Sequence, residues 1–432
     1  MASKNNSSSP SEGKQTLPVN PPFFYGWIIV LIGGLGAFFS GPGQTFTFSV
    51  FIDAYIEDFS ASRTVISSIY SAATLCAGFS LFLIGRLIDK KGQRFMAAAV
   101  GTMLGIACFW NSMLLGPIMM FIGFYMLRLF GQGSMTLVPN TLVPQWFDKQ
   151  RGRAISFMTL GILISAAALP PVNLYLIETW GWRLAWQFWG VLLLVLFVPL
   201  AIIFIRNKPE DVGLLPDNAG KGEDQAKAAA ASAKKRKASS WSMKEAVRSR
   251  QFWFALLCAA VPALINTGIM IHLFSILGEK GIDRTVIAFL LSLMPIAGFI
   301  FTVAAGFIVE KLHVHHLYAV SFLLNAGTLV LLIYVQQIWL IVIYIILWGI
   351  FDGTTKICNN IIWPNYFGLE NLGKLKSMAT TAVVIGSALG PLPFGMAFDY
   401  FGRYNEILWI MMILPLAAGV LALLSPPPVK KG

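Results

Sequence analysis

Charged residues are scarce in this chain. Lysine, arginine, aspartate and glutamate make up 12% of the 432 residues, whereas the hydrophobic types make up 56%. Ordinary soluble domains carry about 25% charged residues. A soluble protein this apolar would expose more hydrocarbon than its few charges could keep in solution. The composition therefore excludes an ordinary globular enzyme, a disordered scaffold and a nucleic-acid-binding protein.

Cysteine is scarce too, and its spacing is not that of a metal or disulfide framework. The four cysteines, Cys76, Cys108, Cys258 and Cys358, all lie in apolar runs without a C-x-x-C pair. We interpret them as small core residues. The sequence also lacks the nucleotide-binding pattern G-x-x-x-x-G-K-[ST] and any obvious nucleophile–base pair. We therefore predict no enzyme activity, no metal and no cofactor.

Long hydrophobic runs are the dominant feature. A helix needs about 20 mostly apolar residues to span a membrane. Twelve runs meet this requirement, at residues 25–51, 64–84, 95–115, 117–143, 154–176, 185–205, 252–277, 285–309, 317–335, 338–362, 377–398 and 405–424. The sequence predicts an all-α, multi-pass membrane protein, located in the plasma (inner) membrane if the source is bacterial.

One long polar stretch, residues 206–251, divides the runs into two sets of six. It contains an Ala/Lys-rich low-complexity segment and is interpreted as a cytoplasmic linker. The N-terminal bundle would occupy residues 23–205 and the C-terminal bundle residues 252–425. We expect residues 1–22 to be a disordered cytoplasmic N-terminus and residues 426–432 a cytoplasmic tail.

The basic residues predict the orientation of the chain. With both termini in the cytoplasm, the inner segments hold 25 lysines and arginines and the outer segments hold five. Such an excess on the cytoplasmic side is typical of membrane proteins. It also accounts for the net charge of +12 without a nucleic-acid partner.

The two halves resemble each other in sequence. Arg63–Ile66 recurs as Arg284–Ile287, 221 residues later. An offset of 220 aligns Gly133, Asn140, Pro144 and Phe147 with Gly353, Asn360, Pro364 and Phe367. Two six-helix bundles related by an axis along the membrane normal indicate a transporter whose substrate site lies between the halves.

Two motifs resemble those of the major facilitator superfamily. Residues 85–94, GRLIDKKGQR, are similar to its G-x-L-x-D-[RK]-x-G-[RK]-[RK] loop, and residues 128–133, RLFGQG, to its R-x-x-x-G-x-G pattern. Within that superfamily, residues 25–27 (YGW) and 146–154 (WFDKQRGRA) resemble the monocarboxylate and oxalate/formate group. The resemblance implies the major facilitator fold, with spans one, four, seven and ten lining the cavity.

The chain departs from that subgroup at its usual cationic positions. Thr302 stands where span eight usually carries a cation, and Gln44 and Thr45 align with the region that holds a lysine in animal carriers. Span eleven contains no lysine. The substrate could therefore differ from those of the group.

Three charged residues lie deep within the predicted spans: Arg128, Asp352 and Lys356. Each costs roughly 2.5–3.5 kcal/mol at mid-helix unless it faces a partner or water. Asp352 and Lys356 are four residues apart, so they share a helix face and can bond. We predict that these three residues bind substrate together with the nearby polar residues Gln44, Thr45, Gln132, Asn266 and Asn359. Alternatively, Arg128 could brace its own helix and the other two could be a neutral structural pair.

Two residues are candidates for proton coupling, Asp352 and His272, although the sequence favours a satisfied polar wall residue at His272. The inner gate is predicted to consist of residues around the loop motif and its repeat, namely Gly85, Asp89, Gly92, Arg94 and Glu310. Simple turn chemistry is the alternative for Asp89 and Arg94.

Together these features predict a secondary active transporter that moves a small organic anion, a carboxylate, by proton symport or exchange. A zwitterionic or larger amphipathic solute is an alternative, such as an amino acid, a peptide-like compound, a siderophore or a drug. A receptor or scaffold with a transporter fold is a second alternative. The expected partners are the solute, protons and membrane lipid, without nucleic acid, and we expect a monomer.

Overall fold

The computed structural model describes residues 17–19, 21–147, 150–216, 241–309, 312–368 and 371–428. In these ranges the chain folds into helices and connecting turns, without a strand. Eleven helical stretches within them are long and apolar enough to cross a membrane. The fourth predicted span, which carries Arg128 and Gln132, is a further continuous helical stretch from Pro117 to Trp146.

The first half of the chain forms six helical passes, several of which change helix type along their length. The first pass breaks at a 3₁₀ turn, and the fourth and sixth contain π-helical segments. The elements are α1 (Gly26–Phe39), η1 (Gly41–Gly43), α2 (Thr45–Phe59), α3 (Arg63–Lys91), α4 (Gln93–Ser112), α5 (Pro117–Met126), η2 (Leu127–Ser134), α6 (Met135–Trp146), α7 (Arg151–Trp180), α8 (Trp182–Leu192), η3 (Leu193–Phe197), α9 (Val198–Phe204) and η4 (Glu210–Val212).

The second half repeats this arrangement of six passes. Its elements are α11 (Met243–Arg248), α12 (Arg250–Gly278), α13 (Arg284–Val309), α14 (Val314–Tyr334), α15 (Ile338–Phe367), α16 (Leu372–Leu389), α17 (Pro391–Phe401) and α18 (Asn405–Leu423). The first predicted run ended at residue 51, but α2 continues to Phe59. Helix α3 likewise continues seven residues past its predicted end at residue 84, to Lys91. The other passes agree with the predicted runs to within five residues at each end.

Corresponding helices pack together in the two halves. In the first half α1 packs against α7 and α4 against α8, and in the second half α12 packs against α16 and α14 against α18. Glycine allows the closest of these approaches. A Cβ added at Gly161 would lie 1.9 Å from the carbonyl oxygen of Gly34, and one at Gly386 would lie 2.6 Å from that of Ala260. The sequence repeat is thus a structural repeat.

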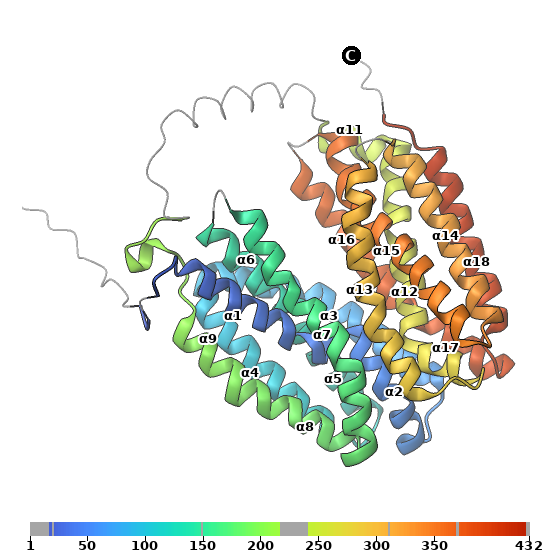
Figure 1. Cartoon of the computed structure of the whole chain (residues 1–432), viewed down its shortest axis with the longest axis horizontal. Coiled ribbons are helices and arrows are strands. Elements are labelled where there is room, and N and C mark those ends of the chain that lie inside the picture. Colours follow the sequence, from blue (N-terminus) through green and yellow to red (C-terminus); the bar gives the residue numbers. More distant parts are fainter. Residues whose placement is uncertain are drawn as a thin grey trace, which may run out of the picture.

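The halves meet at one end of the molecule. We call this the outer end, because it holds Arg63, Arg183, Arg284 and Arg403, which the charge distribution predicts to face outside. Its orientation in a membrane remains a prediction. Here α3 packs against α17, α2 against α12 and α7 against α13. Figure 1 shows the ribbons of the two halves converging near α2, α3 and α17 and diverging toward α6, α11 and α16.

The described ends of the predicted linker pack on their own halves. The carbonyl of Arg206 accepts a hydrogen bond from the Trp146 indole at 3.2 Å. On the other side, the backbone N–H of Trp241 donates to the carbonyl of Phe367 at 3.0 Å. Helix α11 then begins with a capping box between Ser242 and Glu245. Residues 217–240 of the predicted linker lie outside the described residues.

Candidate substrate-binding site

Two cavities near the middle of the spans are lined by polar and charged residues from both halves. The first, which we call the arginine cavity, has a volume of about 310 Å³ and lies between α3, η2, α6 and α16. Its lining comprises Thr74, Ala77, Gly78, Leu81, Arg128, Gln132, Gly133, Thr136, Leu137, Asn140, Val383, Val384 and Ser387. The second, which we call the ion-pair cavity, has a volume of about 240 Å³. Its lining comprises Thr45, Phe46, Ala166, Asn266, Thr267, Met270, Leu291, Pro295, Trp348, Asp352 and Lys356.

A break in the first pass positions Arg128. The segment Gly41-Pro42-Gly43 interrupts the helix, so the carbonyl of Gly43 is available to a side chain. Gly43 lies so close to η2 that an added Cβ would be 2.2 Å from the carbonyl oxygen of Leu127. At this contact Arg128 Nη1 donates to Gly43 O at 3.1 Å and to Thr45 Oγ1 at 3.3 Å. The π-helical turn η2 carries Arg128, as is common for π-bulges at functional sites.

Arg128 is a buried cation without an acidic partner among the described residues. Its side chain is 2% exposed, and its Nε has no hydrogen-bond partner within the described part of the chain. The guanidinium carbon lies 5.0 Å from the ring centre of Tyr70, which offers a cation–π contact. Two neutral oxygens and an aromatic face do not neutralise the charge. The arginine cavity thus presents an uncompensated positive charge.

Asp352 and Lys356 form the ion pair expected from their spacing. Lys356 Nζ lies 2.6 Å from Asp352 Oδ2. The Asp352 side chain is 10% exposed and the Lys356 side chain 58%, so the ammonium group is the more accessible partner. Gly298 of α13 makes room for the carboxylate, because a Cβ there would lie 2.6 Å from Asp352 Oδ2. The ion-pair cavity is therefore close to neutral.

The two cavities share a polar wall. Thr45 lines the ion-pair cavity and accepts the hydrogen bond from Arg128 of the arginine cavity. Thr267 of the ion-pair cavity and Ser387 of the arginine cavity lie 2.8 Å apart, within hydrogen-bond distance. The wall could bond a ligand from either side, since hydroxyl groups both donate and accept.

Some polar groups near the cavities have bonding capacity left. The hydroxyl of Thr74 is buried, lines the arginine cavity and has no partner in the described structure. Gln132 lines the same cavity. In the ion-pair cavity Asn266 accepts a hydrogen bond from the Trp348 indole at 3.3 Å, which leaves its amide nitrogen free to donate. These groups suit a ligand with hydroxyl or carbonyl substituents.

Three of the predicted residues line neither cavity. Gln44 donates to Ser40 Oγ at 3.1 Å, and Asn359 accepts from the Trp363 indole at 3.4 Å. His272 lies at the outer end, where it contacts Ser67 of the other half. The polar character of these residues was recognisable from the sequence, whereas the direction of each side chain was not.

The predicted inner gate is described only in part. Gly92 separates α3 from α4 with φ of 81°, a left-handed conformation that favours glycine. The backbone N–H of Arg94 donates to Asn207 Oδ1 at 2.9 Å, and its Nε donates to the carbonyl of Ile202 at 3.0 Å, both within its own half. Gly85 lies within α3 with open space around it. The Asp89 side chain and Glu310 lie outside the described residues.

The sequence predicted no metal site, and such a site would need a cluster of histidine, cysteine, aspartate or glutamate side chains. In the described ranges no group of three or more histidine, cysteine, aspartate or glutamate side chains could hold a metal ion. A larger cavity of about 460 Å³ lies between α1 and α7. Its lining consists of aliphatic, aromatic and glycine residues, of which only Trp27 has a polar side-chain group. The lining holds no charged side chain that could bind an ionic ligand.

Several residues that line a cavity or connect the two halves were not recognisable as candidate site residues from the sequence. Asp53 and Asp399 form contacts between the halves at the outer end, and Thr74 lines the arginine cavity. Asp53 fell just beyond the predicted end of the first span. The repeat of Arg63–Ile66 as Arg284–Ile287 was the sequence feature that could have pointed to the contacts at the outer end, because Arg63 and Arg284 both contact Asp53.

Two pseudo-symmetric bundles of six passes, with charged residues in cavities lined by both halves, are the architecture of a polytopic transporter. The chain belongs to the Major Facilitator Superfamily, whose sequence profile matches residues 33–278 and 263–432. It is a secondary transporter and an integral, multi-pass protein of the plasma membrane, not an enzyme. The fold predicted from the sequence is thereby confirmed.

The subgroup resemblance is supported by curated relatives. Human monocarboxylate transporter 2 is 22% identical over 426 residues, which cover 94% of this chain and 87% of that protein. The probable L-galactonate transporter of Escherichia coli (strain K12) is 28% identical over 159 residues. That match covers 35% of this chain and only 33% of the relative.

Solved structures support the same fold over nearly the whole chain. The crystal structure of a D-xylose–proton symporter aligns with a TM-score of 0.71 at 14% identity and covers 94% of this chain and 99% of that one. A bacterial homologue of the human lysosomal transporter Spinster, in an inward-facing and occupied conformation, aligns with a TM-score of 0.67 at 15% identity and covers 94% and 97%. At such identities the likeness concerns the fold alone.

Proposed function

We propose that this transporter moves a small organic anion with one carboxylate group, and that the carboxylate binds Arg128 in the arginine cavity. The observation that carries the proposal is the buried guanidinium of Arg128, which has no acidic partner among the described residues. A buried charge is costly unless an opposite charge or hydrogen-bond partners compensate it. A bound carboxylate would supply both, because arginine forms paired hydrogen bonds with carboxylates.

The charge balance favours a monoanion. Lys356 is paired with Asp352, so the two cavities together hold one uncompensated positive charge. A dicarboxylate would bring a second negative charge without a matching cation. The human relative is named a monocarboxylate transporter, which agrees with this charge balance.

The neutral polar groups favour an anion that also carries hydroxyl or carbonyl groups. Thr74 and Gln132 are available beside Arg128, and Asn266 is available in the second cavity. A volume of about 310 Å³ lies at the lower end of the range for small-molecule sites, which begins at about 300 Å³. One relative is named a probable L-galactonate transporter, and galactonate is a carboxylate of this polar kind.

A ligand screen followed by counterflow tests the proposal. The detergent-purified protein is heated with matched panels of carboxylates, their primary amides and the corresponding alcohols. A ligand that binds the folded state raises the unfolding temperature. We expect monocarboxylates to stabilise the protein and their amides and alcohols to have no effect. Ligands that stabilise should then show counterflow in proteoliposomes. Equal stabilisation by a carboxylate and its amide would contradict the proposal.

A zwitterionic substrate is a second candidate because the Asp352–Lys356 pair presents both charges to one cavity. An amino acid could place its ammonium group at Asp352 and its carboxylate at Arg128. Comparison of an α-amino acid with the 2-hydroxy acid of the same carbon skeleton in the screen separates the two candidates. Preference for the amino acid would favour the zwitterion.

Proton coupling through Asp352 is a further part of the proposal, as is a monomeric transporter. Asp352 is the acid that lines a candidate cavity, whereas His272 lies at the outer end. In proteoliposomes Asp352→Asn should lose the acceleration of uptake by an inward proton gradient while still exchanging solute. If the gradient accelerates the variant as strongly as the unmodified protein, Asp352 does not couple protons.

A further inference from the structure

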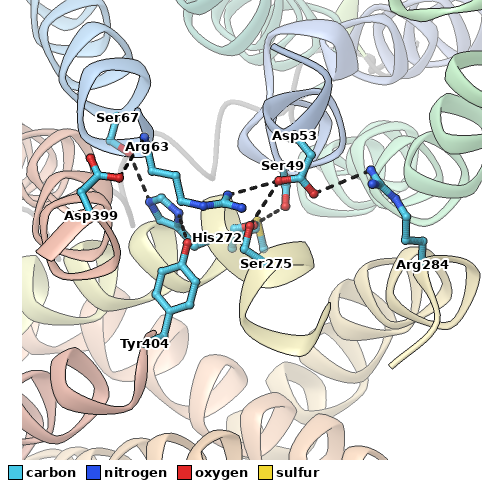
Figure 2. A network of polar contacts seen from close by, with 10 residues as sticks. Ser49, Asp53, Arg63, Ser67, His272, Ser275, Arg284, Asp399 and Tyr404 are labelled. Atoms are coloured by element: carbon cyan, nitrogen blue, oxygen red, sulfur yellow. Dashed lines mark hydrogen bonds and ion pairs between the residues drawn. The ribbon is translucent and has the colours of Figure 1, made fainter. Parts of the chain in front are cut away.

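The outer end holds a set of polar contacts that join the two halves (Figure 2). Asp399 of α17 accepts hydrogen bonds from the backbone N–H groups of Arg63 at 3.3 Å and Thr64 at 2.9 Å. These two residues begin α3, in the other half. The first N–H groups of a helix lack partners within the helix and form its positive end. Asp399 therefore caps a helix that belongs to the opposite bundle.

Asp53 of α2 connects arginines from both halves. Its Oδ1 lies 3.2 Å from Arg63 Nη1 and accepts from Ser275 Oγ at 3.2 Å, and its Oδ2 lies 3.7 Å from Arg284 Nη2. Arg63 and Arg284 are equivalent positions of the sequence repeat. Ser275 and Arg284 belong to the second half, so two of the three contacts of Asp53 cross between the bundles (Figure 2).

A buried histidine supports the same contact. His272 Nε2 lies 3.1 Å from the carbonyl oxygen of Pro391, which can only accept, so Nε2 carries the proton. Nδ1 then accepts from the Tyr404 hydroxyl at 3.0 Å. Burial raises the pKa of Tyr404, which keeps this hydroxyl protonated. His272 Nε2 also lies 3.2 Å from Ser67 Oγ of α3.

The backbones of α3 and α17 touch beside this network. A Cβ added at Gly395 would lie 2.9 Å from both the Arg63 carbonyl oxygen and Ser67 Oγ. The contact between α3 and α17 is thus closely packed as well as polar. Its opening would separate the capped helix end, the ion pairs and the packed backbones together.

The start of α13, which the sequence repeat makes equivalent to the start of α3, has no such cap from the opposite half in the described structure. The repeat offset of 221 aligns Arg63 and Thr64 with Arg284 and Thr285, and it aligns Asp399 with Glu178 of α7. The backbone N–H of Thr285 donates to its own neighbour Asp283 at 2.8 Å, and hydrogen bonds from Thr285 lower the pKa of that carboxyl. Glu178 is exposed, and the described structure shows no hydrogen bond or ion pair for it.

We propose that a one-sided latch holds the outer end closed: Asp399 caps α3 from the opposite half, and Asp53 joins Arg63 to Arg284. Asp399 and Asp53 are positioning residues of the transport cycle, since they act on the helices and not on the substrate. On the other side of the outer end, α7 and α13 pack together, but in the described structure no carboxylate of α7 caps α13 as Asp399 caps α3. The latch does not depend on which solute is transported.

The experiment measures opening of the outer end in the full-length protein without substrate. Spin labels are attached to cysteines at the exposed positions 57 in α2 and 400 in α17, after replacement of the exposed Cys76 by serine. Pulsed electron paramagnetic resonance then gives the distance distribution between the halves in nanodiscs. The matched variants are Asp399→Asn and, at the equivalent position, Glu178→Gln. Asp53→Asn provides an independent test of the latch.

We expect Asp399→Asn to raise the ratio of outward-open to closed molecules by about tenfold, equal to about 1.4 kcal/mol, and Asp53→Asn to act in the same direction. Glu178→Gln should leave the distribution unchanged. An unchanged distribution in both aspartate variants would overturn the latch, and so would an equal shift in Glu178→Gln. Because no substrate is added, these results do not depend on the proposed carboxylate specificity.

Discussion

Replacement of Arg128 by glutamine is the sharpest test of the substrate site. The glutamine side chain is polar but shorter, and it lacks the positive charge and the fork of donors of arginine. In the structure Nη1 already bonds Gly43 and Thr45, whereas Nε has no partner in the described chain. A carboxylate that reaches Nε and the adjacent Nη2 would gain two charge-assisted hydrogen bonds. Such bonds contribute about 1.5–3 kcal/mol each.

The expected loss of binding free energy can be measured as a smaller stabilisation of the protein by the ligand in the thermal-shift assay. A net loss of about 3 kcal/mol weakens binding about 150-fold. A ligand at 100 times its dissociation constant stabilises the protein by about 2.7 kcal/mol. In Arg128→Gln the same concentration would stabilise it by only about 0.3 kcal/mol. Arg128→Lys should fall between the two, because lysine keeps the charge but cannot form the paired hydrogen bonds.

The control for folding is the unliganded variant, which should elute as the unmodified protein does in size-exclusion chromatography. A ligand that binds only through the ion-pair cavity would stabilise Arg128→Gln and the unmodified protein equally. That result would refute the assignment of Arg128 as the anion site. The buried guanidinium of Arg128 would then have a purely structural role in η2.

The remaining predictions concern the ion pair and the helix packing. Lys356→Gln alone should lower the unfolding temperature more than the double variant with Asp352→Asn does, because the single change leaves the mostly buried Asp352 carboxylate unpaired. If the effect of the double variant is the sum of the two single effects, the residues act independently. Gly161→Ala should lower the free energy of unfolding by about 1–3 kcal/mol, because the added Cβ would meet the α1 backbone. Gly327 has open space around it, so Gly327→Ala should raise the free energy of unfolding by about 0.5–1 kcal/mol. Thermal unfolding monitored by circular dichroism measures both, and equal effects of the two alanines would contradict the packing argument.

The sequence predicts the passes and the buried charges well, because both follow from the cost of polar groups in hydrocarbon. That cost singles out Arg128 and the Asp352–Lys356 pair, and the structure places all three beside cavities. Hydropathy cannot tell where a helix continues past the apolar region. The first run was therefore ended at residue 51, and the role of Asp53 in α2 was missed.

The direction of polar side chains was less predictable. The break at Gly41–Gly43 changes the helical phase, so the sequence could not show that Gln44 turns to Ser40 while its neighbour Thr45 turns to the cavity. Contacts such as that of Asp399 with Thr64 join residues 335 positions apart. A single sequence does not reveal such contacts between distant residues of the two halves.

The two charged centres of the candidate site belong to different halves of the chain. Arg128 is anchored to the first bundle through the carbonyl of Gly43, whereas Asp352 and Lys356 are anchored to the second through α15. Under the proposed function, a solute that contacts both centres would therefore connect the two halves of the molecule. The distance between the centres in each state of the transport cycle would then limit the length of the solutes that can make both contacts.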